Sequence, residues 1–217
     1  MTLNKLKEDF YLQSCLKAAK ELIGKVLVRK KGRKIYSGII VETEAYLGDR
    51  DAASHSFNGI TKRNEQMFCP GGTAYVYFTY GNHYCVNAVI GKPGVAHAVL
   101  IRALEPVKGI ETMKKNRSID NIYELCSGPG KLTQAMEING ELNGASLLED
   151  EIYIALPESV SKHKIIRTKR IGITKNADVL YRFIDSESPF VSRVNYKRIL
   201  KTHRKKTQKL ITVNDSC

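Results

Sequence analysis

The segment YVYFTYGNHYCVN, residues 75–87, predicts the central element of the fold, a β-hairpin. Two alternating runs meet at Gly81-Asn82, which are residue types that two-residue hairpin turns favour. Tyr80 stands directly before this turn. Because the tip of a hairpin is normally exposed to water, a large aromatic side chain buries little surface there. The position of Tyr80 therefore needs an explanation other than packing.

The rest of the chain predicts strands joined by hairpins, with helices in separate blocks. This pattern indicates one α+β domain with a mostly antiparallel sheet. We expect the sheet to be curved, the helices to be peripheral and the hairpin to protrude. The predicted strands are residues 25–29, 35–46, 96–104, 151–154 and 170–173, and the predicted helices are residues 7–23, residues 105–115 with Pro106 near the start, and the segment after the glycine-proline loop SGPG.

The composition favours a polyanionic partner. The chain has 217 residues, with 35 Lys and Arg against 22 Asp and Glu, which gives a net charge of +13. Such an excess favours nucleic acid first and an anionic membrane second. The length suits a single domain, which we expect over residues 1–200. Residues 201–217 are strongly basic, and we expect a mobile tail there.

Cysteine usage and the N-terminus indicate the compartment. The five cysteines are odd in number and show no zinc-binding spacing, which predicts a reducing environment and no structural zinc. The N-terminus has no apolar signal core, and no apolar run is long enough to span a membrane. We expect a cytoplasmic protein, associated with the nucleoid in a bacterium or nuclear in a eukaryote.

A second signal lies in GIIVETEAYLG, residues 38–48. If this segment is a strand, Ile40, Glu42, Glu44 and Tyr46 share one face, which places two carboxylates beside an aromatic ring. Taken alone, the stretch is more typical of a half-exposed strand with solvated glutamates. The polar, irregular segment that follows it carries a histidine and a basic cluster, and function concentrates in such loops.

Several motifs occur in a fixed order: VETEAYLG, ASHS, TKRN, PGGTAYVYFTYGNHYCVN, LIRALEP, LCSGPGKLTQAM and RIGI. Together they resemble the alkyladenine (3-methyladenine) DNA glycosylase family, the monofunctional glycosylases related to the human alkylpurine enzyme. The resemblance covers residues 25–193. It implies an enzyme that flips alkylated or deaminated purines out of duplex DNA in base excision repair. The implied bases are 3-methyladenine and 7-methylguanine, with hypoxanthine and ethenoadenine as further candidates.

The resemblance also implies how the N-glycosidic bond is hydrolysed. Glu44, and not Glu42, activates a water molecule and offsets the positive charge of an oxocarbenium-like transition state, which leaves an abasic site. Arg102 and the backbone carbonyl of Ile171 hold the same water. Arg102 also tends to keep Glu44 ionised. A second carboxylic acid is not needed for a base that already carries a positive charge.

The flipped base needs a flat pocket, and the resemblance assigns its walls. Tyr46, His55 and Tyr77 stack on the base, because aromatic faces attract electron-poor alkylated purines. Asn87 lies near the purine edge and helps to reject the amino group of normal guanine. For Tyr77, a role as an ordinary core aromatic is the main alternative.

The resemblance answers the question about Tyr80, which matches a tyrosine that wedges into DNA ahead of the turn residue Gly81. Stacking on bases is worth roughly 1–3 kcal/mol, comparable to the few kcal/mol that flipping costs. Without the resemblance, packing of Tyr80 back onto the sheet would be slightly favoured over the wedge. Family members commonly carry an apolar residue after the turn glycine, whereas this chain has Asn82.

Further matched residues are expected to contact the DNA backbone. Thr61, Arg63 and Met67 match a loop that touches DNA beside the lesion, although TKRN replaces the frequent TPRN. The SGPGKL loop places amide groups and Lys131 at a helix start, which suits phosphate.

We expect no cofactor, no metal and no membrane contact, and a monomer that binds double-stranded DNA with a damaged purine. The sequence pattern of a P-loop is not met, because it requires Gly where this chain has Leu125 and Ser or Thr where it has Leu132. The motifs of zinc deaminases are absent. A glycosylase with lyase activity needs an amine nucleophile, and none of the matched pocket positions is a lysine. The open alternative is a non-catalytic minor-groove lesion binder, which would share the charge and the wedge but would not need Glu44 beside Tyr46 together with Arg102.

Overall fold

The computed structural model describes residues 3–79, 81–159 and 161–192. The predictions for Tyr80 and for the basic tail, residues 201–217, lie outside this part of the chain.

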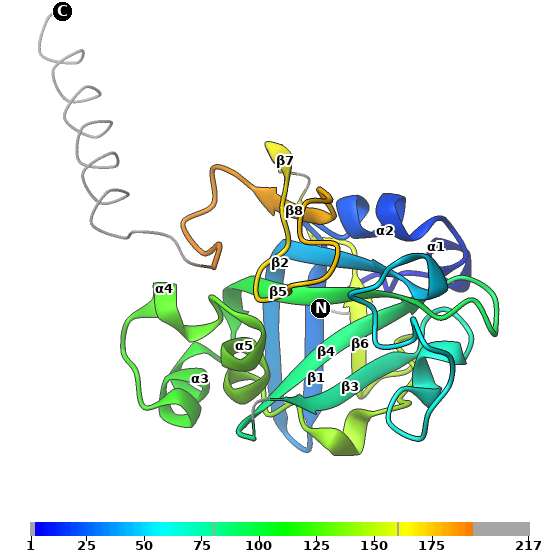
Figure 1. Ribbon diagram of the computed structural model, residues 1–217. Coiled ribbons are helices and arrows are strands. Elements are labelled where there is room, and N and C mark those ends of the chain that lie inside the picture. Colours follow the sequence, from blue (N-terminus) through cyan, green and yellow to red (C-terminus); the bar gives the residue numbers. More distant parts are fainter. Residues whose placement is uncertain (1–2, 80, 160, 193–217) are drawn as a thin grey trace, which may run out of the picture.

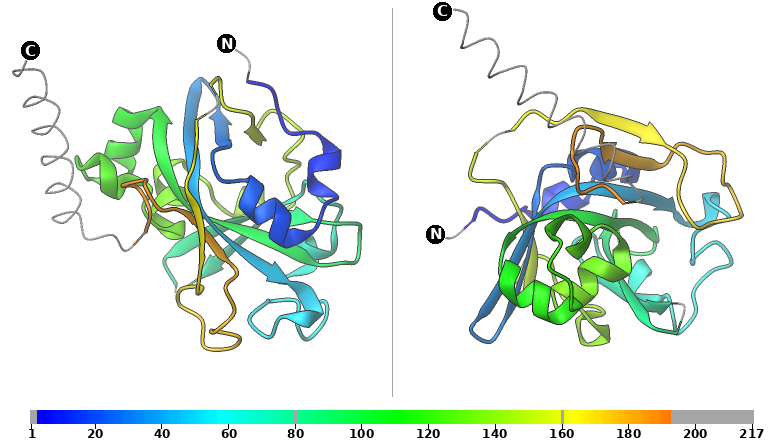
Figure 2. Two further views of the ribbon diagram at one scale, coloured as in Figure 1. Left: turned by 90° about the horizontal axis from the view of Figure 1, so that it is seen from above. Right: turned by 90° about the vertical axis from the view of Figure 1, so that its left-hand side faces the viewer.

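One curled antiparallel sheet dominates the described residues (Figures 1 and 2). Its strands run in the order β3-β4-β5-β2-β1-β6, and β8 pairs with both β2 and β7. The sheet closes into a half-barrel, so the predicted α+β class with a curved antiparallel sheet is confirmed. The strands are β1 (Val26–Lys31), β2 (Lys34–Leu47), β3 (Ala74–Thr79), β4 (His83–Ile90), β5 (His97–Lys108), β6 (Ile152–Ala155), β7 (Ile165–Thr168) and β8 (Arg182–Asp185).

Short helices lie at the periphery, as predicted. Figure 1 shows α3, α4 and α5 grouped at one end of the sheet and α1 and α2 at the other. The α-helices are α1 (Glu8–Tyr11), α2 (Cys15–Glu21), α3 (Ile110–Arg117), α4 (Ile122–Leu125) and α5 (Pro129–Ala135), and the 3-10 helices are η1 (Gly48–Arg50), η2 (Glu65–Phe68) and η3 (Gly140–Leu142).

The predicted single helix over residues 7–23 is wrong, because the chain breaks between α1 and α2. The backbone carbonyl of Tyr11 accepts the N–H of Gly91 at 2.7 Å instead of an intrahelical donor. Ser14, which precedes α2, is extended with φ −67° and ψ 140°. A tertiary hydrogen bond to the loop after β4 therefore outweighs the helical periodicity of the sequence.

Two further predictions near the site are corrected. Residues 105–108 continue β5 and do not begin a helix, because Glu105 and Pro106 still pair with β2. The following helix starts only after Gly109, whose φ of +82° turns the chain. Residues 170–173 form a loop and not a strand, since the pairing segment of this region is β7 with β8.

The prediction that four side chains of β2 share one face is correct for Glu42, Glu44 and Tyr46 and wrong for Ile40. The pairing between β2 and β5 shifts register at Ile40/Glu42 and again at Glu42/Thr43. Ile40 consequently packs with Ala45 in the main core cluster, whereas Glu42 and Glu44 both contact Arg102. Such irregularities bend a strand and redirect its side chains. Here they turn two carboxylates towards one arginine.

The loop before β3 packs backbone against backbone, which gives a test of the fold. A Cβ atom on Gly71 would lie 2.6 Å from the carbonyl oxygen of Tyr11 and 2.9 Å from that of Gly91. We expect Gly71→Ala to lower the free energy of unfolding by roughly 1–3 kcal/mol, as overpacking does, in urea titrations. Gly140→Ala is the matched control, because its nearest neighbour is a side-chain atom of Tyr84 at 3.4 Å. Equal losses in the two variants would contradict this account.

Candidate active site

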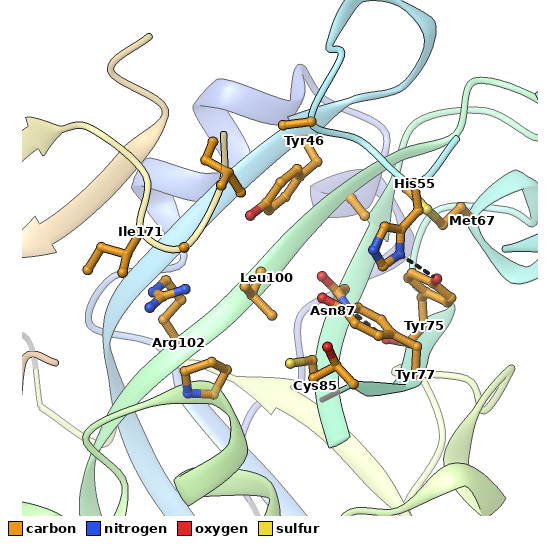
Figure 3. Close-up of a pocket in the computed structure, with 16 residues that line it drawn as sticks. Tyr46, His55, Met67, Tyr75, Tyr77, Cys85, Asn87, Leu100, Arg102 and Ile171 are labelled. Atoms are coloured by element: carbon orange, nitrogen blue, oxygen red, sulfur yellow. Dashed lines mark hydrogen bonds between the residues drawn. The ribbon is translucent and has the colours of Figure 1, made fainter. Parts of the chain in front are cut away.

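A cavity of about 170 Å³ opens between β2, the β3–β4 hairpin and the loop after β7 (Figure 3). For comparison, an engineered cavity of about 150 Å³ accepts a benzene molecule, so this space suits a planar aromatic group. Its lining combines aromatic rings with a few polar groups, the composition typical of ligand sites. The lining residues used below are Tyr46, His55, Met67, Tyr75, Tyr77, Asn87, Arg102 and Ile171.

Aromatic rings form two sides of the cavity. Tyr75 and Tyr77 share one face of β3 because strand side chains alternate, and their ring centroids are 5.2 Å apart. The His55 ring meets the Tyr77 ring at 4.5 Å and 69°. Figure 3 shows Tyr46 across the cavity from His55 and Tyr77. The structure thus brings together the three residues that were predicted to stack on a base.

His55 is held in a defined position by two contacts. Its Nδ1 pairs with the Tyr75 hydroxyl at 2.9 Å, and its carbonyl accepts from Asn64 Nδ2 at 2.8 Å. Burial, assisted by the positive charge of Arg63, lowers the pKa of His55 below its usual value. The ring is therefore neutral at pH 7. Asn64 was not among the predicted site residues, because its only signal in the sequence is its place at the end of the TKRN motif.

Asn87 forms a polar part of the cavity on β4. It stands opposite Tyr75 in the strand register, and its Nδ2 donates to the Tyr75 carbonyl at 2.9 Å. This bond fixes the amide group beside the cavity. Asn87 is thereby placed to read the hydrogen-bonding edge of a bound ring.

Glu44 is fully buried directly behind the cavity lining. Its Oε1 accepts the N–H of Ile171 at 2.8 Å. Its Oε2 accepts the Tyr46 hydroxyl at 2.9 Å and Arg102 Nη1 at 3.3 Å. Three residues that border the cavity therefore converge on one carboxylate.

Burial raises the pKa of Glu44 above its usual value, and this effect exceeds the opposing effects of Arg102, the Ile171 N–H and Tyr46. The expectation that Arg102 favours the ionised form is correct in sign, but Arg102 does not decide the net direction. Burial also raises the pKa of Tyr46 well above its usual value. Tyr46 therefore keeps its proton and remains a donor to Glu44.

Glu42 is buried too, and its oxygens are occupied by donors. Its Oε1 accepts Arg102 Nε at 3.0 Å, Arg182 Nε at 2.7 Å and the Ser192 hydroxyl at 2.8 Å. Its Oε2 accepts the Ser192 N–H at 2.7 Å. Glu42 thus orients Arg102. Arg182 and Ser192 were missed in the sequence, because nothing local marks them as partners of β2.

A further buried ion pair, between Asp51 and Arg170, lies behind Tyr46. Arg170 donates to both oxygens of Asp51, with Nη2 at 2.8 Å from Oδ1, and to the Ala45 carbonyl at 2.9 Å. Its guanidinium carbon lies 4.6 Å from the centre of the Tyr46 ring. Burial opposes the charge of Asp51, but the bonds from Arg170 hold the pKa of that carboxyl below its usual value. Neither residue was among the predicted site residues.

The residues predicted to contact DNA occupy different surroundings. Arg63 lies near the hairpin, where it donates to the Phe78 carbonyl at 3.2 Å. Met67 is buried and lines the cavity. Gly81 adopts φ +70° in the hairpin turn. Thr61 and Lys131 are not cavity residues, and Lys131 donates to the Ser127 hydroxyl at 3.4 Å.

The described residues contain no helix that is long and apolar enough to cross a membrane. In the same part of the chain, no group of three or more His, Cys, Asp or Glu side chains is placed to hold a metal ion.

Comparisons with known proteins cover most of the chain. The family model described as methylpurine-DNA glycosylase matches residues 9–189. A relative from Chlorobium phaeobacteroides (strain BS1), named "Putative 3-methyladenine DNA glycosylase", is 50% identical over 191 residues, or 88% of this chain and 96% of the relative. Relatives with the same name come from Prosthecochloris aestuarii (49% over 188 residues; 86% and 90%) and Carboxydothermus hydrogenoformans (49% over 189 residues; 87% and 98%).

The bond between Tyr46 and Glu44 can be tested without any assumption about activity. Tyr46→Phe removes a donor to the ionised carboxylate, so we expect the pKa of Glu44 to rise further. The measurement is a pH titration of the Glu44 side-chain carbon by NMR. Tyr75→Phe is the control, because its hydroxyl bonds to His55 and not to Glu44. An unchanged or lower pKa in Tyr46→Phe would show that this donor does not stabilise the carboxylate.

Proposed function

We propose that the cavity receives a flipped purine and that Glu44 activates the water molecule that releases this base. The premise is that the chain belongs to the methylpurine-DNA glycosylase family. The chain is a DNA-3-methyladenine glycosylase, a hydrolase of N-glycosyl bonds that acts on damaged DNA in base excision repair.

The base stacks between Tyr46 on one side and His55 and Tyr77 on the other. The size of the cavity and the facing rings support this placement. Aromatic faces attract positive charge, so 3-methyladenine and 7-methylguanine are the first substrates, and hypoxanthine and ethenoadenine are further candidates. Asn87 contacts the edge of the purine. A single unpaired polar group at such an edge can discriminate strongly between bases.

The observation that carries the mechanism is the buried Glu44 carboxylate with three donors at the cavity wall. A water molecule attacks C1′ of the sugar while the bond to the base breaks. Glu44 takes the proton of the water, and its charge stabilises the cationic transition state. A cationic base leaves as a neutral molecule with the bonding electrons, so it needs no acid.

Water reaches Glu44 beside Arg102 and Ile171, which border the cavity. The Ile171 N–H already orients Glu44, and we assign the Ile171 carbonyl to the water. Catalytic hydrogen bonds often tighten only when substrate is bound. The present close packing of Tyr46 on Glu44 therefore describes the free enzyme.

The β3–β4 hairpin presents the surface that meets DNA. We assign the wedge to Tyr80, which lies outside the described residues, and backbone contacts to Thr61, Arg63 and Lys131. The net charge of +13 supports binding to a polyanion. We further propose that the enzyme is a monomer and that it hydrolyses the bond without a lyase step.

The role of Glu44 is tested by single-turnover release of 7-methylguanine and of hypoxanthine from two duplexes. We expect Glu44→Gln to bind both duplexes as the wild type does and to release base at least about 10²-fold more slowly. Glu149→Gln, at an exposed position, is the control and should match the wild type. If the wild type binds both duplexes tightly and releases neither base, the minor-groove binder is the better account.

The pH dependence of the reaction gives a separate test. Glu44 must be ionised to accept a proton, and burial raises its pKa. We expect the single-turnover rate on 7-methylguanine to fall as the pH is lowered, with a midpoint above the usual glutamate pKa of ~4.3. Rates measured with Glu44→Gln at each pH serve as the background. A rate that increases towards low pH would contradict a glutamate base.

A further inference from the structure

We propose that the buried Asp51–Arg170 ion pair sets the preference of the cavity for positively charged bases over neutral ones. This inference rests on the proposed function, because it requires the base to stack on Tyr46. Asp51 and Arg170 act as positioning residues and touch neither the base nor the reacting atoms.

The first observation is the position of the pair relative to the ring. The Arg170 guanidinium lies over the Tyr46 ring, with its central carbon 4.6 Å from the ring centre. The cavity borders Tyr46 but not Arg170 or Asp51. Tyr46 therefore separates the guanidinium from the space for the base, in the order arginine, tyrosine, base.

The positive charge of Arg170 would act on a base that stacks on the other side of the Tyr46 ring. A cationic base stacked about 3.5 Å in front of Tyr46 would lie roughly 8 Å from the guanidinium. At an effective dielectric constant near 20, repulsion between two positive charges at that distance disfavours binding by on the order of tenfold or more. The cation–π attraction of the ring for the base would be largely cancelled.

Asp51 removes this penalty. Its two oxygens bind the two terminal nitrogens of Arg170, and both side chains are fully buried, so water screens the pair little. The next carboxylate whose charge acts on Arg170 is Glu44, but Glu44 is already bound to Arg102. Neutralisation of Arg170 therefore depends on Asp51.

The pair also has a mechanical role that must be separated from the electrostatic one. Asp51 accepts the N–H of Ala53 at 3.2 Å and Asn176 Nδ2 at 3.2 Å. It thereby joins the loop that carries His55 to the loop that carries Ile171. Loss of this link would impair all substrates alike, because it loosens the cavity without regard to the charge of the base.

The test uses the ratio of two single-turnover rates, 7-methylguanine release over hypoxanthine release, measured with one preparation of each variant. Asp51→Asn leaves Arg170 without its counter-charge, and we expect the ratio to fall about tenfold. Loss of Arg170 raises the pKa of the buried Asp51 carboxyl. Above that pKa, Arg170→Gln leaves a negative charge behind the ring, and we expect the ratio to rise there. The double variant Asp51→Asn/Arg170→Gln removes both charges and should return the ratio to within about threefold of the wild type.

Partial unfolding does not affect this test, because both rates depend on the same folded fraction. If Asp51→Asn does not fold, the rise expected for Arg170→Gln still decides the inference. Equal losses on both bases, or a shift in the same direction for both single variants, would show that the pair is only a mechanical link. A wild type that releases neither base would instead overturn the proposed function.

Discussion

The site depends on one constraint, that each of its buried carboxylates lies beside a guanidinium group. An unpaired charge in the interior costs several kcal/mol, whereas a paired one with satisfied hydrogen bonds is tolerated. The three buried carboxylates of β2 and its following loop each meet this requirement with an arginine from another segment. The pairs are Glu44 with Arg102, Glu42 with Arg102 and Arg182, and Asp51 with Arg170.

These ion pairs are poor stabilisers, because desolvation offsets most of their attraction. Their role is to hold the charged side chains of the site in fixed positions. Arg102 is fixed by Glu42 on one edge and contacts Glu44 with the other. The result is a carboxylate that is close to the cavity, sheltered from bulk water and more basic than usual. On the opposite side, His55 and the hairpin tyrosines supply stacking surfaces without charge.

The sequence predicted much of this arrangement where the signal was local. Alternation over residues 75–87 predicted the hairpin, and the period of two in β2 placed Glu42, Glu44 and Tyr46 together. It failed where a distant partner decided the outcome. The bulge that separates Ile40 from Glu42 is imposed by pairing with β5. Asp51 and Arg170 are 119 residues apart, and Glu42 and Ser192 are 150 apart, so no local pattern could reveal them. The roles assigned to the individual site residues stay predictions.

The bonds from Ser192 to Glu42 have a consequence for the order in which this protein can be made. Glu42 and Ser192 are 150 residues apart, so Glu42 leaves the ribosome well before Ser192. Until then, the carboxylate of Glu42 lacks its two donors from Ser192. Only after residue 192 has emerged can its backbone N–H and hydroxyl complete the hydrogen bonds of Glu42. A chain truncated before this residue lacks two of the donors that hold Glu42, the carboxylate that orients Arg102.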